Sequence, residues 1–195
     1  GRFYILAVSQ NSVRLFQAAF DSIRQIEIPD APPDIDEMLK QYAGEKHIEW
    51  HTQMPYRPGL RQAYYHGQGA ASLHSDDKIW QFLFLVDKGI HNILKTEKVP
   101  MVFSGVDYLY PIWKNITSYP SLCPEFIVTN PDRLNARDLL DRAKDLVSPI
   151  FKQMKMQAVE KYKTFAGSGH TSRDPDEIIT AAQQGRIDIL FIANS

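Results

Sequence analysis

The sequence has little cysteine, no excess of one charge and no long apolar run. Its one cysteine, Cys123, forms no internal disulfide and supplies no cysteine-based zinc site. The 22 Lys+Arg and 23 Asp+Glu give a net charge of −1, which argues against a strongly basic domain that coats nucleic acid. No apolar stretch approaches the roughly 20 residues that span a bilayer. We therefore expect a soluble, reduced, cytoplasmic protein without a membrane partner.

The 195 residues fit one domain, or one domain and a piece of another. The chain starts at Gly1 without an initiator Met or a signal peptide, so we expect an excised piece. The apolar patterns predict strands first and then alternating helices and strands, which indicates an α/β fold with a mixed central sheet and helices on both faces. The predicted strands cover residues 3–9, 13–16, 22–28, 47–53, 99–104, 125–129 and 187–193. The predicted helices cover residues 34–42, 76–94, 107–115, 135 to beyond 154, and 176–184, with a kink or boundary expected at Pro149.

The segment from Pro55 to Ser75 has no periodicity and is long for a connection within a domain. Between Met54 and Ser75 there is no Asp or Glu, although the average composition predicts two or three in such a stretch. The segment carries basic and aromatic side chains instead: Arg57, Arg61, His66, His74, Tyr56, Tyr64 and Tyr65. Basic side chains contact phosphates and tyrosine stacks on unpaired bases, so the pattern favours a polyanion such as RNA over a merely connecting loop. Small residues surround Gln68, which makes it the one functional side chain at the tip.

Other chemistry is weakly supported by the residues. His47 and His51 are four apart, but on the expected strand they lie about 13 Å apart, so we predict surface or partly packed histidines and no metal site. Cys123 lacks a visible base and is expected to be a packed, inert thiol. Gly67-Gln68-Gly69 follows no buried strand in the manner that a nucleotide-binding turn requires. No cofactor is therefore predicted.

The order of several motifs resembles a known family. The opening FYILAVSQNSVRLF resembles the first hairpin of the middle domain of archaeo-eukaryotic class 1 peptide-chain-release factors and of pelota. HGQGAASLHSDDKIWQFLFLVDKGI is similar to the family's His-Gly-x-Gly-Gly-Gln-Ser loop with its following helix, and FSG, EFIVT and a long helix come next. DPDEIITAAQQGRIDILFIA resembles the start of the family's third domain. The closest resemblance is to the bacterial archaeo-eukaryotic release factor family.

The resemblance implies a ribonuclease-H-like middle domain over residues 1–148 and the truncated start of a third, α/β domain over residues 149–195. It also implies that the loop enters the ribosomal peptidyl-transferase centre, where Gly-Gly-Gln helps water to attack the ester of peptidyl-tRNA. Gly67 and Gln68 match the last two motif positions, and His66 stands where the first glycine is expected. An alternative register puts Gly67 and Gly69 on the glycine positions and Ala70 in place of the glutamine.

Three functional hypotheses follow from these observations. The first is a ribosome-associated release or rescue factor with His66, Gly67 and Gln68 as catalytic residues and Arg57, Arg61, Tyr64, Tyr65 and His74 as RNA contacts. The second is a non-catalytic ribosome- or RNA-binding module, as in hibernation or stalling, because pelota-type relatives lack the motif and do not hydrolyse the ester. The third is a relative in fold alone, with a protein partner. The strand at 187–193 lacks a sheet of its own, so we expect it to pair elsewhere or with a second chain in a homo-oligomer.

Overall fold

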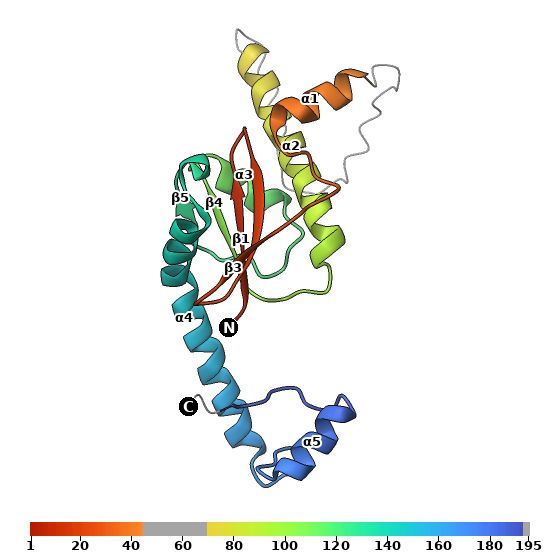
Figure 1. The fold of residues 1–195 in the computed structure, drawn as a ribbon, viewed down its shortest axis with the longest axis vertical. Helices are drawn as coiled ribbons and strands as arrows, with labels where there is room; N and C mark the ends of the chain where they lie inside the picture. Colours follow the sequence, from red (N-terminus) through yellow and green to blue (C-terminus); the bar gives the residue numbers. More distant parts are fainter. Residues whose placement is uncertain (45–69, 193–195) are drawn as a thin grey trace. The chain divides into compact units, whose positions relative to one another are not determined.

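The computed structural model describes residues 1–44 and 70–192, and the chain divides into two compact units, Gly1–Val147 and Ser148–Ser195. The first unit contains a five-stranded sheet with the order β3-β2-β1-β4-β5 (Figure 1). Its strands are β1 (Phe3–Val8), β2 (Val13–Ala18), β3 (Ile23–Ile26), β4 (Met101–Gly105) and β5 (Ile127–Val128). The helices are α1 (Ile35–Gly44), α2 (Ala70–Leu94), α3 (Leu109–Ile116), the 3-10 helix η1 (Pro131–Arg133), α4 (Ala136–Phe165) and α5 (Pro175–Gln183). The predicted α/β class with a mixed sheet is confirmed.

Strand β1 lies at the centre of the sheet and explains the apolar run at the start of the sequence. It pairs antiparallel with β2 and parallel with β4, and all six of its residues are buried. Since side chains alternate across a strand, Tyr4, Leu6 and Val8 face one side and Phe3, Ile5 and Ala7 the other. A strand that is covered on both faces reads as continuously apolar, as predicted.

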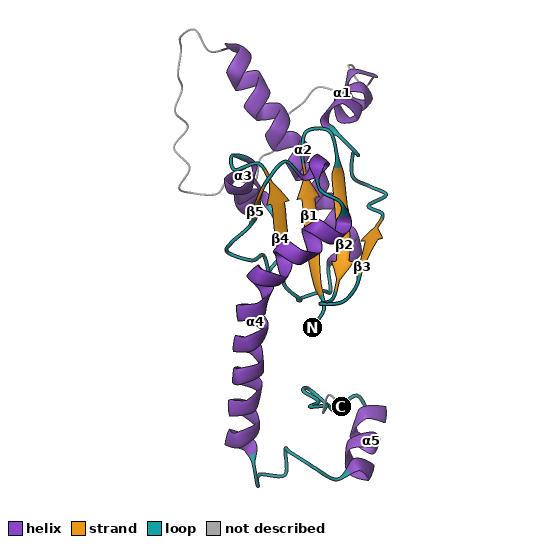
Figure 2. Cartoon of the chain, turned by 60° about the vertical axis from the view of Figure 1, so that its left-hand side comes forward, coloured by secondary structure: helices purple, strands orange, loops and turns teal. Residues whose placement is uncertain are grey.

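Helices cover both faces of the sheet. One apolar cluster joins Tyr4, Leu6 and Val8 of β1 to buried side chains of α1, α2 and α3. On the opposite face lies the first part of α4 (Figure 2), which buries Leu139, Leu140, Ala143 and Val147. The two parallel strands, β4 and β5, are connected through α3, and β1 reaches β4 through the segment that contains α1 and α2. The fold is therefore a three-layer arrangement about one sheet.

Side-chain caps fix several helix starts that the sequence indicates. The Asp34 Oδ1 accepts a hydrogen bond of 2.7 Å from the backbone N–H of Glu37 at the start of α1. Asn135 accepts in the same way from Asp138 at the start of α4, and Asp174 accepts from Asp176 and Glu177 at the start of α5. Such caps satisfy N–H groups that the first helical turn leaves without a partner. Gly185 ends α5 with φ of +65°, as its sequence position predicts.

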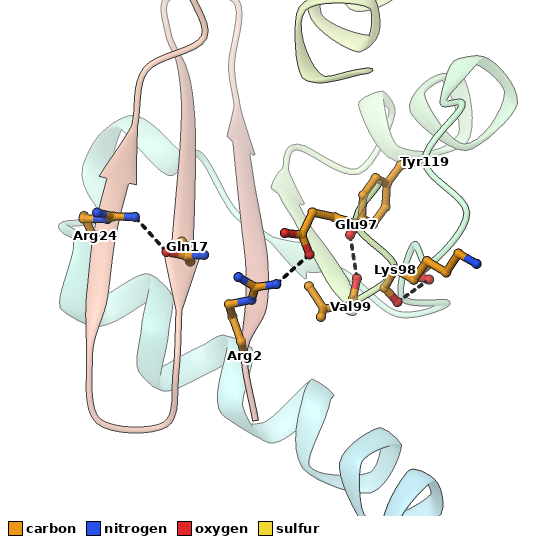
Figure 3. A network of polar contacts seen from close by, with 8 residues as sticks. Arg2, Gln17, Arg24, Glu97, Lys98, Val99 and Tyr119 are labelled. Carbon is orange, nitrogen blue, oxygen red and sulfur yellow. Dashed lines mark hydrogen bonds and ion pairs between the residues drawn. The ribbon is translucent and has the colours of Figure 1, made fainter. Parts of the chain in front are cut away.

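A polar network ties the start of β1 to the connection between α2 and β4 (Figure 3). The Arg2 guanidinium lies 2.7 Å from the Glu97 carboxylate, and the Tyr119 hydroxyl donates to the Val99 carbonyl at 2.7 Å. Burial raises the pKa of Tyr119, so its hydroxyl keeps the proton that it donates. At the opposite end of the sheet order, Arg24 of β3 donates to Gln17 of β2 at 2.9 Å.

One sequence prediction near the end of the chain is wrong, and another is narrowed. Helix α4 continues through Pro149 to Phe165, so the helix has no end at Pro149, and the kink there stays a prediction. Residues 187–192, the described part of the predicted strand 187–193, form no strand, because the described residues of the second unit offer no strand to pair with them. They contact the end of α4 instead: Phe191 packs edge-to-face on Tyr162, and Asp188 pairs with Lys161. Homo-oligomer formation through this segment stays a prediction.

No helix within the described ranges is long and apolar enough to cross a membrane.

Candidate functional site

Helix α2 begins at Ala70, immediately after the glycine-containing segment that the sequence singles out. The expected start at residue 76 is therefore wrong by more than one helical turn. Ala70 and Ala71 explain the difference, because alanine has the highest helix propensity and extends a helix ahead of a polar residue that could also cap it. Gln68 consequently lies two positions before the first residue of a 25-residue helix.

The part of α2 from Ile79 to Leu94 is fixed by a buried apolar face. Ile79, Phe82, Leu83, Val86, Ile90 and Leu94 recur at helical spacing and are at most 5% exposed. They pack with the sheet residues Tyr4, Leu6 and Phe103 in the main apolar cluster. Because the helix packs on the sheet along so much of its length, its N-terminal end has a fixed position relative to the core.

Polar and steric contacts also restrain α2 on two sides. The buried Asp87 carboxylate accepts from the Thr117 hydroxyl at 3.0 Å and from the Ser118 N–H at 2.9 Å. Asn92 donates to Asp30 at 2.8 Å, which ties the helix to the connection before α1. A Cβ at Gly89 would lie 2.9 Å from the Ala31 Cβ, so only glycine fits where this connection crosses the helix. The C-terminal part of α2 is therefore fixed on the first unit by polar and steric contacts as well as by its apolar face.

One of the predicted site residues, His74, lies in α2. The other predicted catalytic and RNA-contacting residues lie outside the described residues: Arg57, Arg61, Tyr64, Tyr65, His66, Gly67 and Gln68. So do His47 and His51, whose strand and packing stay predictions.

Two aromatic side chains within the packed part of α2 remain exposed to solvent. Trp80 is 42% exposed and Phe84 is 47% exposed. Their rings stack on each other with centroids 5.5 Å apart and an interplanar angle of 8°. Trp80 and Phe84 are four residues apart, a spacing that makes side chains neighbours on a helix surface.

Cys123 is a packed thiol, as predicted. It is 2% exposed, and burial raises the pKa of the thiol to about 11. At neutral pH the thiol is thus protonated, which removes the nucleophilic form. In the described ranges, no group of three or more His, Cys, Asp or Glu side chains is arranged to hold a metal ion.

A second polar cluster lies where β1 ends and η1 begins. The Asp132 carboxylate accepts hydrogen bonds from the Ser9 hydroxyl at 2.9 Å, the Ser12 hydroxyl at 2.5 Å and the Asn11 amide at 3.3 Å. Burial acts to raise the pKa of Asp132, but the bonds from Ser12, Ser9 and Asn11 outweigh it and lower the pKa. Arg14 adds bonds to the Pro131 and Leu134 carbonyls. These bonds join the β1–β2 turn to η1, which is a structural role.

We expect Asp132→Asn to lower the free energy of unfolding by about 1 kcal/mol at neutral pH, since bonds to a charged acceptor are lost at a largely exposed site. A carboxylate whose pKa is lowered by folding stabilises the protein above the unfolded pKa of about 3.9, and this stabilisation is lost as pH falls through the folded pKa. Urea unfolding at pH 7 and at pH 3 measures both effects. Asp145→Asn, at an exposed position of α4, is the matched control. A difference between wild type and Asp132→Asn that is equally large at pH 3 would contradict the assignment.

Comparison with known proteins identifies the family once this geometry is in view. The profile of bacterial archaeo-eukaryotic release factor family 7 matches residues 3–149, which is nearly the whole first unit. The chain belongs to this family. The predicted resemblance is confirmed, and membership in a release-factor-like family supports a translation-related role.

Comparisons with other collections of proteins are less informative. A search of curated proteins found no match. Among the solved structures that match is an archaeal protein with 14% sequence identity and a TM-score of 0.29. The alignment covers 94% of this chain and 46% of the archaeal protein, so the chain spans about half the length of that structure.

Proposed function

We propose that this chain belongs to a cytoplasmic, ribosome-associated factor of the release or rescue type. In this proposal, residues 54–75 enter the peptidyl-transferase centre and promote hydrolysis of the ester that joins the nascent peptide to tRNA. The observation that carries the proposal is the family match over residues 3–149. The position of Gln68 just ahead of α2 supports it, because a helix clamped at its base can hold a loop at a fixed distance from the body of the protein.

The chemistry asked of the loop is modest. Water attacks the ester carbonyl carbon, the bond from that carbon to the ribose oxygen breaks, and the ribose hydroxyl recovers a proton. A neutral amide is a poor base, so the role we assign to Gln68 is to orient the attacking water and shield the ester. Gly67 lets the backbone approach the RNA closely, and backbone N–H groups stabilise the developing oxyanion. His66 completes the proposed catalytic tip.

The remaining proposed site residues contact RNA. Arg57, Arg61 and His74 supply positive or protonatable groups for phosphates, and Tyr64 and Tyr65 supply rings for unpaired bases. The contacts need no cofactor. The segment from Met54 to Ser75 carries no acidic side chain, so nothing within it repels a polyanion.

A second candidate function is a ribosome- or RNA-binding factor without hydrolysis, of the hibernation or stalling type. His66 at the position of the first glycine favours it, since an imidazole takes up space that the family's glycine leaves open. The same loop contacts would then block or occupy the peptidyl-transferase centre without chemistry.

Peptide release from purified ribosome–nascent-chain complexes separates these two functions. The full-length protein is added to stalled complexes, and free peptide is measured over time against a reaction without the factor and one with puromycin. Release by the full-length protein supports hydrolysis. Stable binding to the complexes, with peptidyl-tRNA intact while puromycin still liberates the peptide, would contradict hydrolysis and support the second function.

A further inference from the structure

Helix α2 carries an exposed stripe of side chains, of which His91 contacts the Ser118 hydroxyl at 3.2 Å. It consists of Trp80, Phe84, Lys88, His91 and Lys95, and we call it the α2 stripe. Trp80, Phe84 and Lys88 follow each other at intervals of four residues, so they share one side of the helix, and Lys95 comes directly after its last residue. All five side chains are exposed, whereas the opposite side of the helix is buried.

The two aromatic rings form a platform at one end of the α2 stripe. Their planes are nearly parallel, at 8°, and close to half of each side chain is open to solvent. An exposed tryptophan stacked on an exposed phenylalanine leaves a large apolar surface in water, and such surfaces mark binding sites. A parallel pair of rings also offers a flat outer face, which is the shape that an unpaired base stacks on.

On the C-terminal side of the platform, the exposed charge has one sign. From Phe84 to Lys95, the residue after the end of α2, every exposed ionisable side chain is basic: Lys88, His91 and Lys95. The one carboxylate in this range, Asp87, is buried and bonded to Thr117 and Ser118. On the N-terminal side of the platform, the helix carries two exposed carboxylates, Asp76 and Asp77. Rings next to cations suit single-stranded RNA, whose bases can stack on the rings while neighbouring phosphates contact the lysines. An apolar protein partner would not use the lysines.

We propose that the α2 stripe binds a single-stranded segment of ribosomal RNA, with bases stacked on Trp80 and Phe84 and phosphates contacted by Lys88 and Lys95. The inference rests on the proposed function for its choice of RNA. Along the helix, Trp80 lies about 15 Å and Phe84 about 21 Å from Ala70. The α2 stripe is thus a second RNA contact, separate from the loop, that sets how deeply the loop can enter.

Binding of a fluorescein-labelled 12-nucleotide single-stranded RNA to the full-length protein tests the proposal by anisotropy. The double variant Trp80→Ala/Phe84→Ala is expected to bind at least about tenfold more weakly, because each base–ring stack contributes about 1–3 kcal/mol. Lys88→Gln/Lys95→Gln is expected to make the slope of log affinity against log salt shallower by about 1.4, since two phosphate contacts are lost. Phe20→Ala removes a similarly exposed ring at the β2–β3 turn and is the control.

Tryptophan fluorescence localises the contact. The sequence also contains Trp50 and Trp113, and both are retained in Trp80→Phe. The RNA-dependent quenching that is present in the wild type and absent in Trp80→Phe therefore reports on the α2 stripe. Equal affinity of wild type and Trp80→Ala/Phe84→Ala for the oligonucleotide would overturn the proposal. If that variant nevertheless lost ribosome binding, the α2 stripe would contact a ribosomal protein rather than RNA, which also overturns it. None of these readouts depends on peptide release, so they stand or fall apart from the proposed hydrolysis.

Discussion

Replacing Phe103 by alanine is expected to lower the free energy of unfolding by about 3–5 kcal/mol. Phe103 is fully buried in β4, and its ring lies 5.8 Å from that of Tyr110, 5.9 Å from that of Trp113 and 6.3 Å from that of Phe126. Alanine would leave a cavity that these three neighbouring aromatic side chains and the helices packed on the sheet cannot close. Because domains are commonly stable by about 5–15 kcal/mol, the loss is a large fraction of the total.

Urea unfolding followed by circular dichroism measures this change. Phe165→Ala, at a 40% exposed position in the second unit, is the control and should cost less than about 1 kcal/mol. Phe103→Leu should lie between the two, since leucine refills part of the space. A loss below about 1 kcal/mol for Phe103→Ala would mean that the aromatic cluster under β4 is not the centre of the core.

The Gln68→Ala variant of the full-length protein is expected to release peptide on the order of 100-fold more slowly than wild type. Loss of one group that positions a reactant or stabilises the transition state has an effect of about this size. Gln68 is the side chain that we place next to the attacking water, while ribosome binding depends on the basic and aromatic residues around it. The variant should therefore bind ribosomes with nearly unchanged affinity.

Helix α2 offers a matched control. Gln81→Ala removes the same side chain from a half-buried position of α2 and should leave release unchanged. Release and ribosome binding are measured on the same stalled complexes for wild type and both variants. If Gln68→Ala released peptide as fast as wild type, the assignment of Gln68 would be wrong, even if the protein still hydrolysed the ester.

The sequence predicts the sheet better than it predicts the ends of the chain. Strand β1 could be recognised because burial on both faces makes Phe3–Val8 continuously apolar, and Asp34 and Asp174 mark helix starts by local hydrogen bonds. These signals are local and need no knowledge of distant residues. Residues 187–192 have the composition of a buried strand, but a strand also needs a partner, which composition does not reveal.

Prediction of the site was limited for a similar reason. The Met54–Ser75 segment stands out by its lack of acids, but the early start of α2 at Ala70 depends on propensity outweighing a capping signal at Ser75. The exposure of Trp80 and Phe84 could not be predicted either, because apolar residues on both sides of a helix suggest a central helix whichever side the sheet covers. Only the packing of α2 on the sheet decides which aromatic side chains remain in contact with solvent.

Co-sedimentation of the full-length protein with ribosomes across a salt series tests the central claim, association with the ribosome through RNA, most directly. We predict binding at low salt, with log affinity falling linearly as log salt rises, because phosphate contacts release counterions. Lys88→Gln/Lys95→Gln should make that slope shallower. Failure to bind at low salt, or binding whose affinity does not change with salt, would contradict the account.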